Sequence, residues 1–183
     1  MTTNTTTQIT HDFQDGNGPV PAHRHPNGGG WVADTAKVDA TAYIGPNARV
    51  FGDARVYGDA QVLGNARVYG DALVCGNALV YDNAWVYGNA QVSGNAEVFG
   101  NARVCGNARV CGDAWVCGNA RVYGNARVYG DAWVYGDAEV SGNTWVSATA
   151  QVCGNARVSG NARVCGDARV SGNARVSKGE VTS

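Results

Sequence analysis

The sequence predicts an all-β protein in which a long run of short strands winds into a regular coil. An aliphatic residue, nearly always valine, recurs every six positions from Val32 to Val176, which makes 25 consecutive positions. A small residue, nearly always alanine, stands two positions before each of them, and glycine followed by asparagine or aspartate stands after most of them. Such self-similarity at a fixed period is the signature of a repeat architecture.

Each six-residue unit is expected to contain one short strand and one corner. In the pattern Ala-x-Val, the two apolar side chains face the same side of a strand. Glycine and asparagine both tolerate a left-handed backbone, which suits a corner. A helix is excluded, because glycine falls in nearly every unit and costs about 1 kcal/mol each time. Strands this short become stable when each pairs with the strand one turn further along a coil.

The composition narrows the classes of function. The chain has 183 residues, a formal net charge of -1 and only 16% charged residues, so bulk attraction to nucleic acid is not expected. The chain contains no run of 18 apolar residues, so the sequence predicts no membrane-spanning helix. The first residues contain neither a basic nor an apolar segment of the kind found in secretory signals. We therefore expect a cytoplasmic protein.

The unit small-x-aliphatic-x-x-x resembles the hexapeptide repeat of left-handed parallel β-helices, the superfamily of trimeric acyltransferase-like proteins. The resemblance is nearest to bacterial and phage proteins of nearly pure hexapeptide repeat, and it covers roughly residues 30–177. It implies a triangular prism of about eight turns, with 18 residues per turn, and it implies a trimer. We expect residues 1–30 to form a flexible or capping segment, residues 31–177 the β-helix, and residues 178–183 a tail.

Outward residues that are 18 positions apart lie on the same face of the predicted prism. Grouping them in this way gives three faces, of which the first two are basic and the third is aromatic. An exposed aromatic face indicates a contact surface, for a second copy or for another partner or ligand. The candidate interface or binding residues are Leu79, Tyr81, Phe99, Trp115, Trp133 and Tyr135, with Trp85 and Trp145 on the other faces. The arginine ladders are either neutralised by neighbouring Asp and Asn corners or receive phosphates. The candidate phosphate contacts are Arg103, Arg121, Arg109 and Arg127.

The six cysteines are expected to remain reduced. No two of them are 18 residues apart. The nearest pairs on one ladder, such as Cys75 and Cys111, are two turns or roughly 9.6 Å apart. That separation exceeds the limit of about 7 Å between the Cα atoms of a disulfide.

The three histidines, His11, His23 and His25, all precede the predicted β-helix. Because glycine, proline and asparagine surround His23 and His25, we interpret this segment as a solvated linker. The alternative is a metal site at the axis of a trimer. The resemblance implies that acyltransferases of the superfamily use a coil or loop histidine as general base, and that γ-class carbonic anhydrases bind zinc through histidines on the prism. We assign no catalytic residue, metal or cofactor.

The sequence favours a non-enzymatic, self-associating scaffold or binding protein, of phage or prophage origin as a structural part or an inhibitor of a host defence component. The alternative is a hexapeptide-repeat acyltransferase that acts on a small acceptor with an acyl-CoA. Ice binding is disfavoured, because it needs a flat threonine-rich face. The expected partners are further copies of the chain, with another protein or a small anionic ligand as alternatives, and neither a membrane nor nucleic acid.

Overall fold

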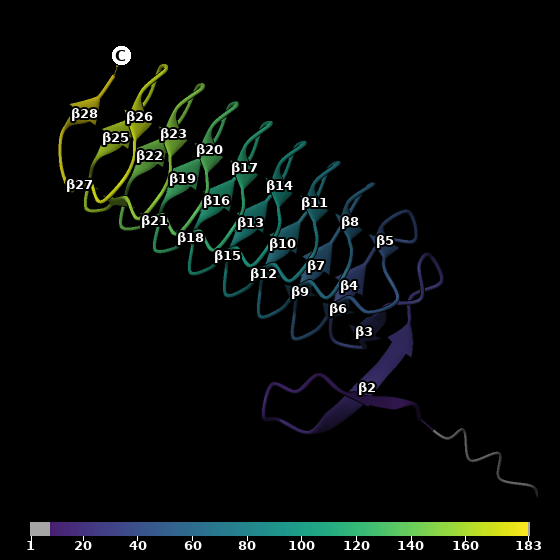
Figure 1. Ribbon diagram of the computed structural model, residues 1–183. Helices are drawn as coiled ribbons and strands as arrows, with labels where there is room; N and C mark the ends of the chain where they lie inside the picture. Colours follow the sequence, from purple (N-terminus) through teal and green to yellow (C-terminus); the bar gives the residue numbers. More distant parts are fainter. Residues whose placement is uncertain (1–7, 183) are drawn as a thin grey trace, which may run out of the picture.

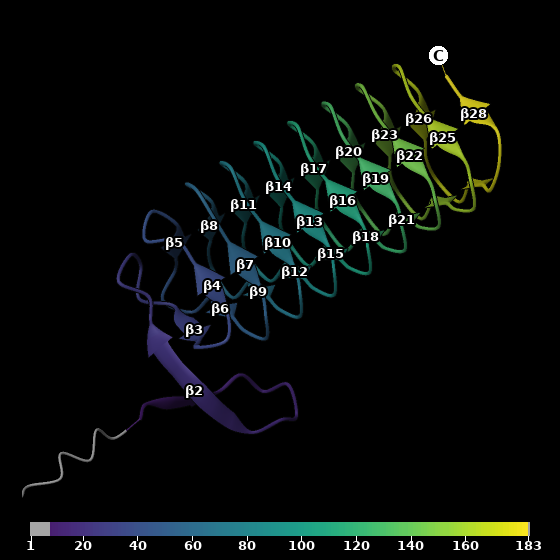
Figure 2. The ribbon, with the colours of Figure 1, turned by 180° about the vertical axis from the view of Figure 1, so that it is seen from behind.

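The chain winds into a left-handed, triangular parallel β-helix that begins after an antiparallel hairpin, as a computed structural model shows (Figure 1). The structure describes residues 8–182. The view from behind shows the same regular stack of coils, with the hairpin strand β2 (Pro19–Arg24) at one end of the stack (Figure 2). Within the described residues, no helix is long and apolar enough to cross a membrane. The predicted fold class is confirmed.

Three sheets form the three faces of the prism. The first face contains β3 (Trp31–Ala33), β6 (Arg49–Val50), β9 (Arg67–Val68), β12 (Trp85–Val86), β15 (Arg103–Val104), β18 (Arg121–Val122), β21 (Glu139–Val140), β24 (Arg157–Val158) and β27 (Arg175–Val176). The second face contains β4 (Lys37–Val38), β7 (Arg55–Val56), β10 (Leu73–Val74), β13 (Gln91–Val92), β16 (Arg109–Val110), β19 (Arg127–Val128), β22 (Trp145–Val146), β25 (Arg163–Val164) and β28 (Glu180–Val181). The third face contains β5 (Tyr43–Ile44), β8 (Gln61–Val62), β11 (Leu79–Val80), β14 (Glu97–Val98), β17 (Trp115–Val116), β20 (Trp133–Val134), β23 (Gln151–Val152) and β26 (Arg169–Val170).

The corners explain why the strands are so short and why the coils stack so closely. Gly106 turns the chain with a φ of 67°. A Cβ atom at this position would lie 3.1 Å from the backbone nitrogen of Gly124, in the next coil. The backbone of each coil then bonds to the next, as in the bond from the Arg103 N–H to the Ala120 carbonyl at 2.9 Å. Glycine thus supplies both the left-handed conformation and the close approach between coils.

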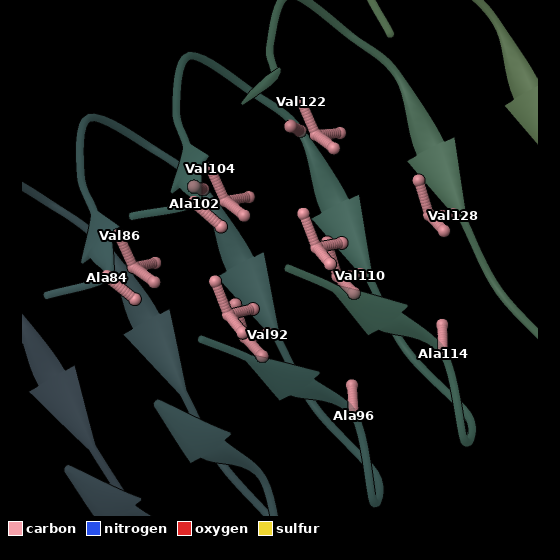
Figure 3. Close-up of a cluster of buried hydrophobic side chains, with 14 of the residues drawn as sticks. Ala84, Val86, Val92, Ala96, Ala102, Val104, Val110, Ala114, Val122 and Val128 are labelled. Carbon is pink, nitrogen blue, oxygen red and sulfur yellow. The ribbon is translucent and has the colours of Figure 1, made fainter. Parts of the chain in front are cut away.

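The core consists almost entirely of valine and alanine stacked in columns. The side chains of Val86, Val104 and Val122 point into the prism from successive coils of one face (Figure 3). Val92 and Val110 do so from the second face, and all five are fully buried. Because each coil fills its interior with the same small side chains, neighbouring coils fit together without further adjustment.

The unit around Val146 departs from the pattern at two positions. Thr144 replaces the buried alanine of its unit, and its hydroxyl is buried without a hydrogen-bond partner among the described residues. Four residues later, Ala148 occupies the corner in place of glycine, with a φ of 56°. Both features cost folding free energy, since a buried hydroxyl loses its water and a left-handed conformation is unfavourable for alanine.

Residues 10–33 close the first end of the prism. Strand β1 (Thr10–Asp12) pairs antiparallel with β2 (Pro19–Arg24), and β2 pairs antiparallel with β3. Phe13 is buried and stacks on Phe51 with ring centroids 4.8 Å apart. The interpretation of the histidine-containing segment as a solvated linker is therefore wrong. The antiparallel pairing extends the first sheet, and the Phe13 ring gives the hairpin a small apolar core of its own.

At the opposite end the strand pairing continues beyond the predicted boundary at residue 177. Strand β28 pairs with β25, and Arg163 is in register with Glu180. Elsewhere in the β-helix, paired residues are 18 apart, as in Arg103 and Arg121. The last step is one residue shorter, because only four residues separate Val176 from Val181. This strand covers one face only, and Ala174 of the last coil is exposed.

Amide ladders run along the corners outside the core. Asn83 donates from its side chain to Asn101 at 3.3 Å, and Asn101 donates to Asn119 at 3.1 Å. The stacked asparagines therefore satisfy one another along the axis and have a structural role.

Candidate functional site

The third face gathers the predicted aromatic contact residues into one patch. We call this set the aromatic patch: Leu79, Tyr81, Phe99, Trp115, Trp133 and Tyr135. Trp115 and Trp133 lie in register on neighbouring strands, and their rings stack with centroids 4.8 Å apart. Trp133 is 41% exposed, and the other members are half-buried. Apolar and aromatic surface of this kind is a candidate contact surface.

Polar contacts within the aromatic patch are few. The Tyr81 hydroxyl donates to Glu97 at 2.9 Å. Burial and this hydrogen bond to a carboxylate raise the pKa of Tyr81. Tyr135 bonds to Gln151 at 3.3 Å in the same way. The two hydroxyl groups thus turn toward polar side chains of the next coil, while the rings remain on the surface.

Trp85 and Trp145 lie apart from the aromatic patch, each between two arginines. The guanidinium carbons of Arg67 and Arg103 lie 5.3 Å and 4.8 Å from the ring centroid of Trp85 on the first face. Trp145 on the second face has the same arrangement, with Arg163 at 4.6 Å. These cation–π contacts separate like charges along the ladder. The structure therefore gives these two tryptophans a different environment from Trp115 and Trp133.

The candidate phosphate contacts form two rungs of like charge. Arg103 is in register with Arg121 on the first face, and Arg109 with Arg127 on the second. All four are exposed, and none of them forms an ion pair with another residue of the described range. Like charges directly opposite one another destabilise a sheet. Both rungs therefore present positive charge that no described carboxylate pairs with directly.

A column of stacked rings runs along the corner that follows the first face. Phe51 stacks on Tyr69 at 4.8 Å, and Tyr69 stacks on Tyr87 at 4.9 Å, with interplanar angles of 3° and 2°. The next position is Cys105, and the ring of Tyr123 follows it. The small thiol thus leaves a gap of one ring in the column.

This gap is a shallow cavity of about 210 Å³ lined by Tyr87, Arg103, Cys105, Arg121 and Tyr123, and we call it the Cys105 notch. A hydrogen bond between the Tyr87 hydroxyl and the Cys105 thiol, together with burial, raises the pKa of Tyr87 to about 12. Sequence reasoning identified the two arginines but missed the notch. The available signal was an aromatic residue both 18 positions before and 18 positions after a cysteine.

All six cysteines are free thiols, as predicted. Within residues 8–182, no group of three His, Cys, Asp or Glu side chains is arranged to hold a metal ion.

The three histidines take part in the hairpin that closes the prism. His11 stacks on Trp31 with ring centroids 4.3 Å apart. His23 lies 2.8 Å from a carboxylate oxygen of Asp34, and His25 is buried beside the carbonyl of Asn27. Their contacts are structural parts of the hairpin and of the loop that follows it.

The hairpin also encloses a cavity of about 400 Å³ against the first coils. Phe13, Val20 and Phe51 line its apolar part, and Asp15 and Asp34 lie at its polar side. Sequence reasoning missed this cavity, because the segment that forms it carries no repeat.

Acid should loosen the hairpin through His11. Burial, followed by the positive charges of Arg49 and Arg24, lowers the pKa of His11 below its ordinary value of 6.5. The unfolded segment therefore binds the proton more readily, so the contribution of His11 to stability is complete above pH 6.5 and is lost as the pH falls below it. We expect amide hydrogen exchange in β1 and β2 to accelerate below pH 6.5 in excess of its intrinsic pH dependence. The variant His11→Phe keeps an aromatic ring and should lose this acid sensitivity; equal sensitivity in both proteins would contradict the assignment.

Comparison with known proteins agrees with the repeat seen in the structure. A family model described as YdcK beta solenoid repeat matches residues 48–64, 60–76, 72–88, 90–104, 102–118, 120–136, 150–166, 162–178 and 168–181. The matches omit residues 137–149, which include the irregular unit with Thr144 and Ala148. A comparison with curated proteins gave no match. Since the matched segments cover more than half of the chain, the protein belongs to the YdcK β-solenoid repeat family.

Proposed function

We propose that the protein is a non-enzymatic scaffold, a rigid rod that associates with further copies of itself through the aromatic patch. The observation that carries the proposal is the stacked pair of Trp115 and Trp133 on a flat parallel sheet, with Trp133 41% exposed. A large aromatic side chain in water is unusual on a monomer surface and typical of a contact.

The distribution of charge supports a second copy of the chain as the partner that covers the aromatic patch. The first and second faces carry the arginine rungs, which would repel the same face of another copy. Among the outward strand residues of the third face, Glu97 is the one carboxylate, and that group already accepts a hydrogen bond from Tyr81. Of the three faces, the third therefore opposes the fewest like charges when two copies meet.

A lateral trimer suits this geometry best. Three prisms placed side by side each bury one long face, and cyclic symmetry closes the assembly so that it does not extend into a filament. The long axis of each rod then runs parallel to the others, and the open strand edges at the ends of the coils remain outside the contact.

Light scattering on the purified full chain tests the proposal. The wild type should have about three times the chain mass of 19.0 kDa. The double variant Trp115→Glu and Trp133→Glu should be a folded monomer, because both side chains point away from the core and their carboxylates would oppose one another across the contact.

The matched control is the double variant Trp85→Glu and Trp145→Glu. It makes the same chemical change on the other two faces, where each new carboxylate lies between arginines. It should remain a trimer. A wild-type mass near 19.0 kDa would refute self-association, and dissociation of the control variant alone would place the contact on another face.

A further inference from the structure

We propose that the Cys105 notch binds a planar aromatic ring that carries a phosphate group, the chemistry of a nucleoside monophosphate. The proposal concerns the first face and is independent of self-association through the third. It rests on three features that meet in one cavity: a gap in a column of stacked rings, two guanidinium groups beside the gap that form no ion pair with a described residue, and a small side chain at its floor.

The gap has the dimension of one ring. Neighbouring rings of the column are 4.8 Å and 4.9 Å apart, centroid to centroid. Tyr87 and Tyr123 are two strand spacings apart, or about 9.6 Å. A ligand ring inserted above Cys105 would therefore stack on both tyrosines at the spacing that the column already uses. Stacking of a base on an aromatic side chain tolerates any base, because every base presents a π-face.

The charge beside the gap suits a phosphate. Arg103 and Arg121 lie in register on β15 and β18 and line the same cavity as the two tyrosines. Guanidinium groups bind phosphate through paired, charge-assisted hydrogen bonds. A phosphate bridging the two side chains would also remove the repulsion along this rung. Glu139 is in register with Arg121 on the next strand of the ladder, but it forms its ion pair, at 3.7 Å, with Arg157.

Two other places in the chain carry part of this arrangement and not all of it. On the second face, Arg109, Cys111, Arg127, Tyr129 and Trp145 line a cavity of about 250 Å³. There the position one coil before Cys111 is Ser93, so a ligand ring would stack on one side only. On the third face, Cys117 lies between Phe99 and Tyr135, but its outward neighbours are Trp115 and Trp133 and supply no positive charge. The Cys105 notch alone among these three combines both rings with both arginines.

The volume of the cavity limits the size of the ligand that the Cys105 notch can bind. A volume of about 210 Å³ is smaller than the pockets of roughly 300–1,000 Å³ that enclose drug-sized molecules. One ring and its phosphate fit the notch and the adjacent arginines, with the sugar toward solvent. We therefore expect a mononucleotide to bind as well as a longer chain does.

Calorimetric titration of the full chain with adenosine 5′-monophosphate tests the site. We expect saturable binding with one site per chain, and at least tenfold weaker binding of adenosine and of inorganic phosphate, since each lacks one half of the ligand. Cys105→Tyr should reduce the affinity at least tenfold by filling the gap with a ring. The variant should fold, because the same column accepts Phe51, Tyr69 and Tyr87 at the preceding positions.

The second face supplies the matched controls. The double variant Arg103→Gln and Arg121→Gln should lose binding at least tenfold, whereas Arg109→Gln with Arg127→Gln should keep it. Equal loss in both double variants would indicate non-specific attraction and overturn the proposal. So would undiminished binding by Cys105→Tyr, an absence of saturable binding, or inorganic phosphate binding as tightly as the nucleotide.

A measurement on the unmodified chain avoids any question about folding of the variants. Alkylation of the thiols by iodoacetamide, followed by peptide mass analysis, reports each cysteine separately. The nucleotide should slow the modification of Cys105 and leave that of Cys111 unchanged. Equal rates at Cys105 with and without the nucleotide would contradict insertion of the ring above this thiol.

Discussion

Replacing Val110 by aspartate should destroy the cooperative folding of the solenoid. Val110 is fully buried in the middle of the rod, between Val92 and Val128 of the neighbouring coils. A carboxyl group there finds only valine and alanine, so neither its ionised nor its protonated form can be satisfied. We expect a loss of at least about 4 kcal/mol of folding free energy, which belongs to the exceptional range for a single substitution. Thermal melting followed by circular dichroism measures it.

Two matched variants distinguish the effect of burying a carboxyl group from the effect of introducing its charge. Arg109→Asp places the same carboxylate one residue earlier on the outer side of β16 and should melt like the wild type. Val176→Asp lies in the last coil, where the side chain is only half-buried and contacts a single neighbouring coil. Because each coil contacts its neighbours only, this variant should fray one end and leave the rest folded. Wild-type melting of Val110→Asp would show that the coil interior admits water.

Restoring the repeat in the irregular unit should stabilise the protein by about 2 kcal/mol. Thr144→Ala removes a buried hydroxyl whose missing hydrogen bond costs about 1–3 kcal/mol, at the loss of one buried methyl group worth about 0.8 kcal/mol. Ala148→Gly relieves a left-handed conformation that costs an alanine about 1–2 kcal/mol. For a chain of this length, we expect the double variant to melt about 4–8 °C higher.

The reverse changes one coil earlier provide the control. Ala126→Thr and Gly130→Ala introduce the same two departures at the equivalent positions, where alanine is buried and glycine has a φ of 72°. This variant should melt at a lower temperature by a similar amount. A double variant of Thr144 and Ala148 that melts at or below the wild-type temperature would show that the irregular unit is not a strained one.

The coil itself could be predicted from the sequence because every unit places the same types of residue at the same positions. Val104 faces inward, Arg103 outward and Gly106 turns the corner, and the same assignment holds 18 residues further on. The register, the core, the composition of the three faces and the free thiols follow from this one rule. The use of the aromatic patch as an interface is a further step and remains a prediction.

Two kinds of feature were not predicted from the sequence. Some lie in segments that lack the six-residue period, and others depend on which side chains meet on adjacent coils. The hairpin of β1 and β2 has no repeat, and its proline- and glycine-rich sequence is typical of a linker until Phe13 is seen to stack on Phe51. Strand β28 was not predicted, because the separation between its residues and their partners on β25 is one residue shorter than in the other coils. The Cys105 notch escaped because a cysteine is unremarkable by itself and forms a gap only between Tyr87 and Tyr123.

The direction of the backbone hydrogen bonds determines how the rod responds to mechanical load. The bonds from Arg103 to Ala120 and from Cys105 to Val122 join one coil to the next, so they lie along the rod. A pulling force applied to the two ends loads the coils in series, and it opens the bonds of one coil before those of the next. Each opened coil releases 18 residues, or about 60 Å of extended chain, where it had occupied about 4.8 Å of the rod. Stretched in this way, the molecule yields coil by coil and takes up extension in equal steps.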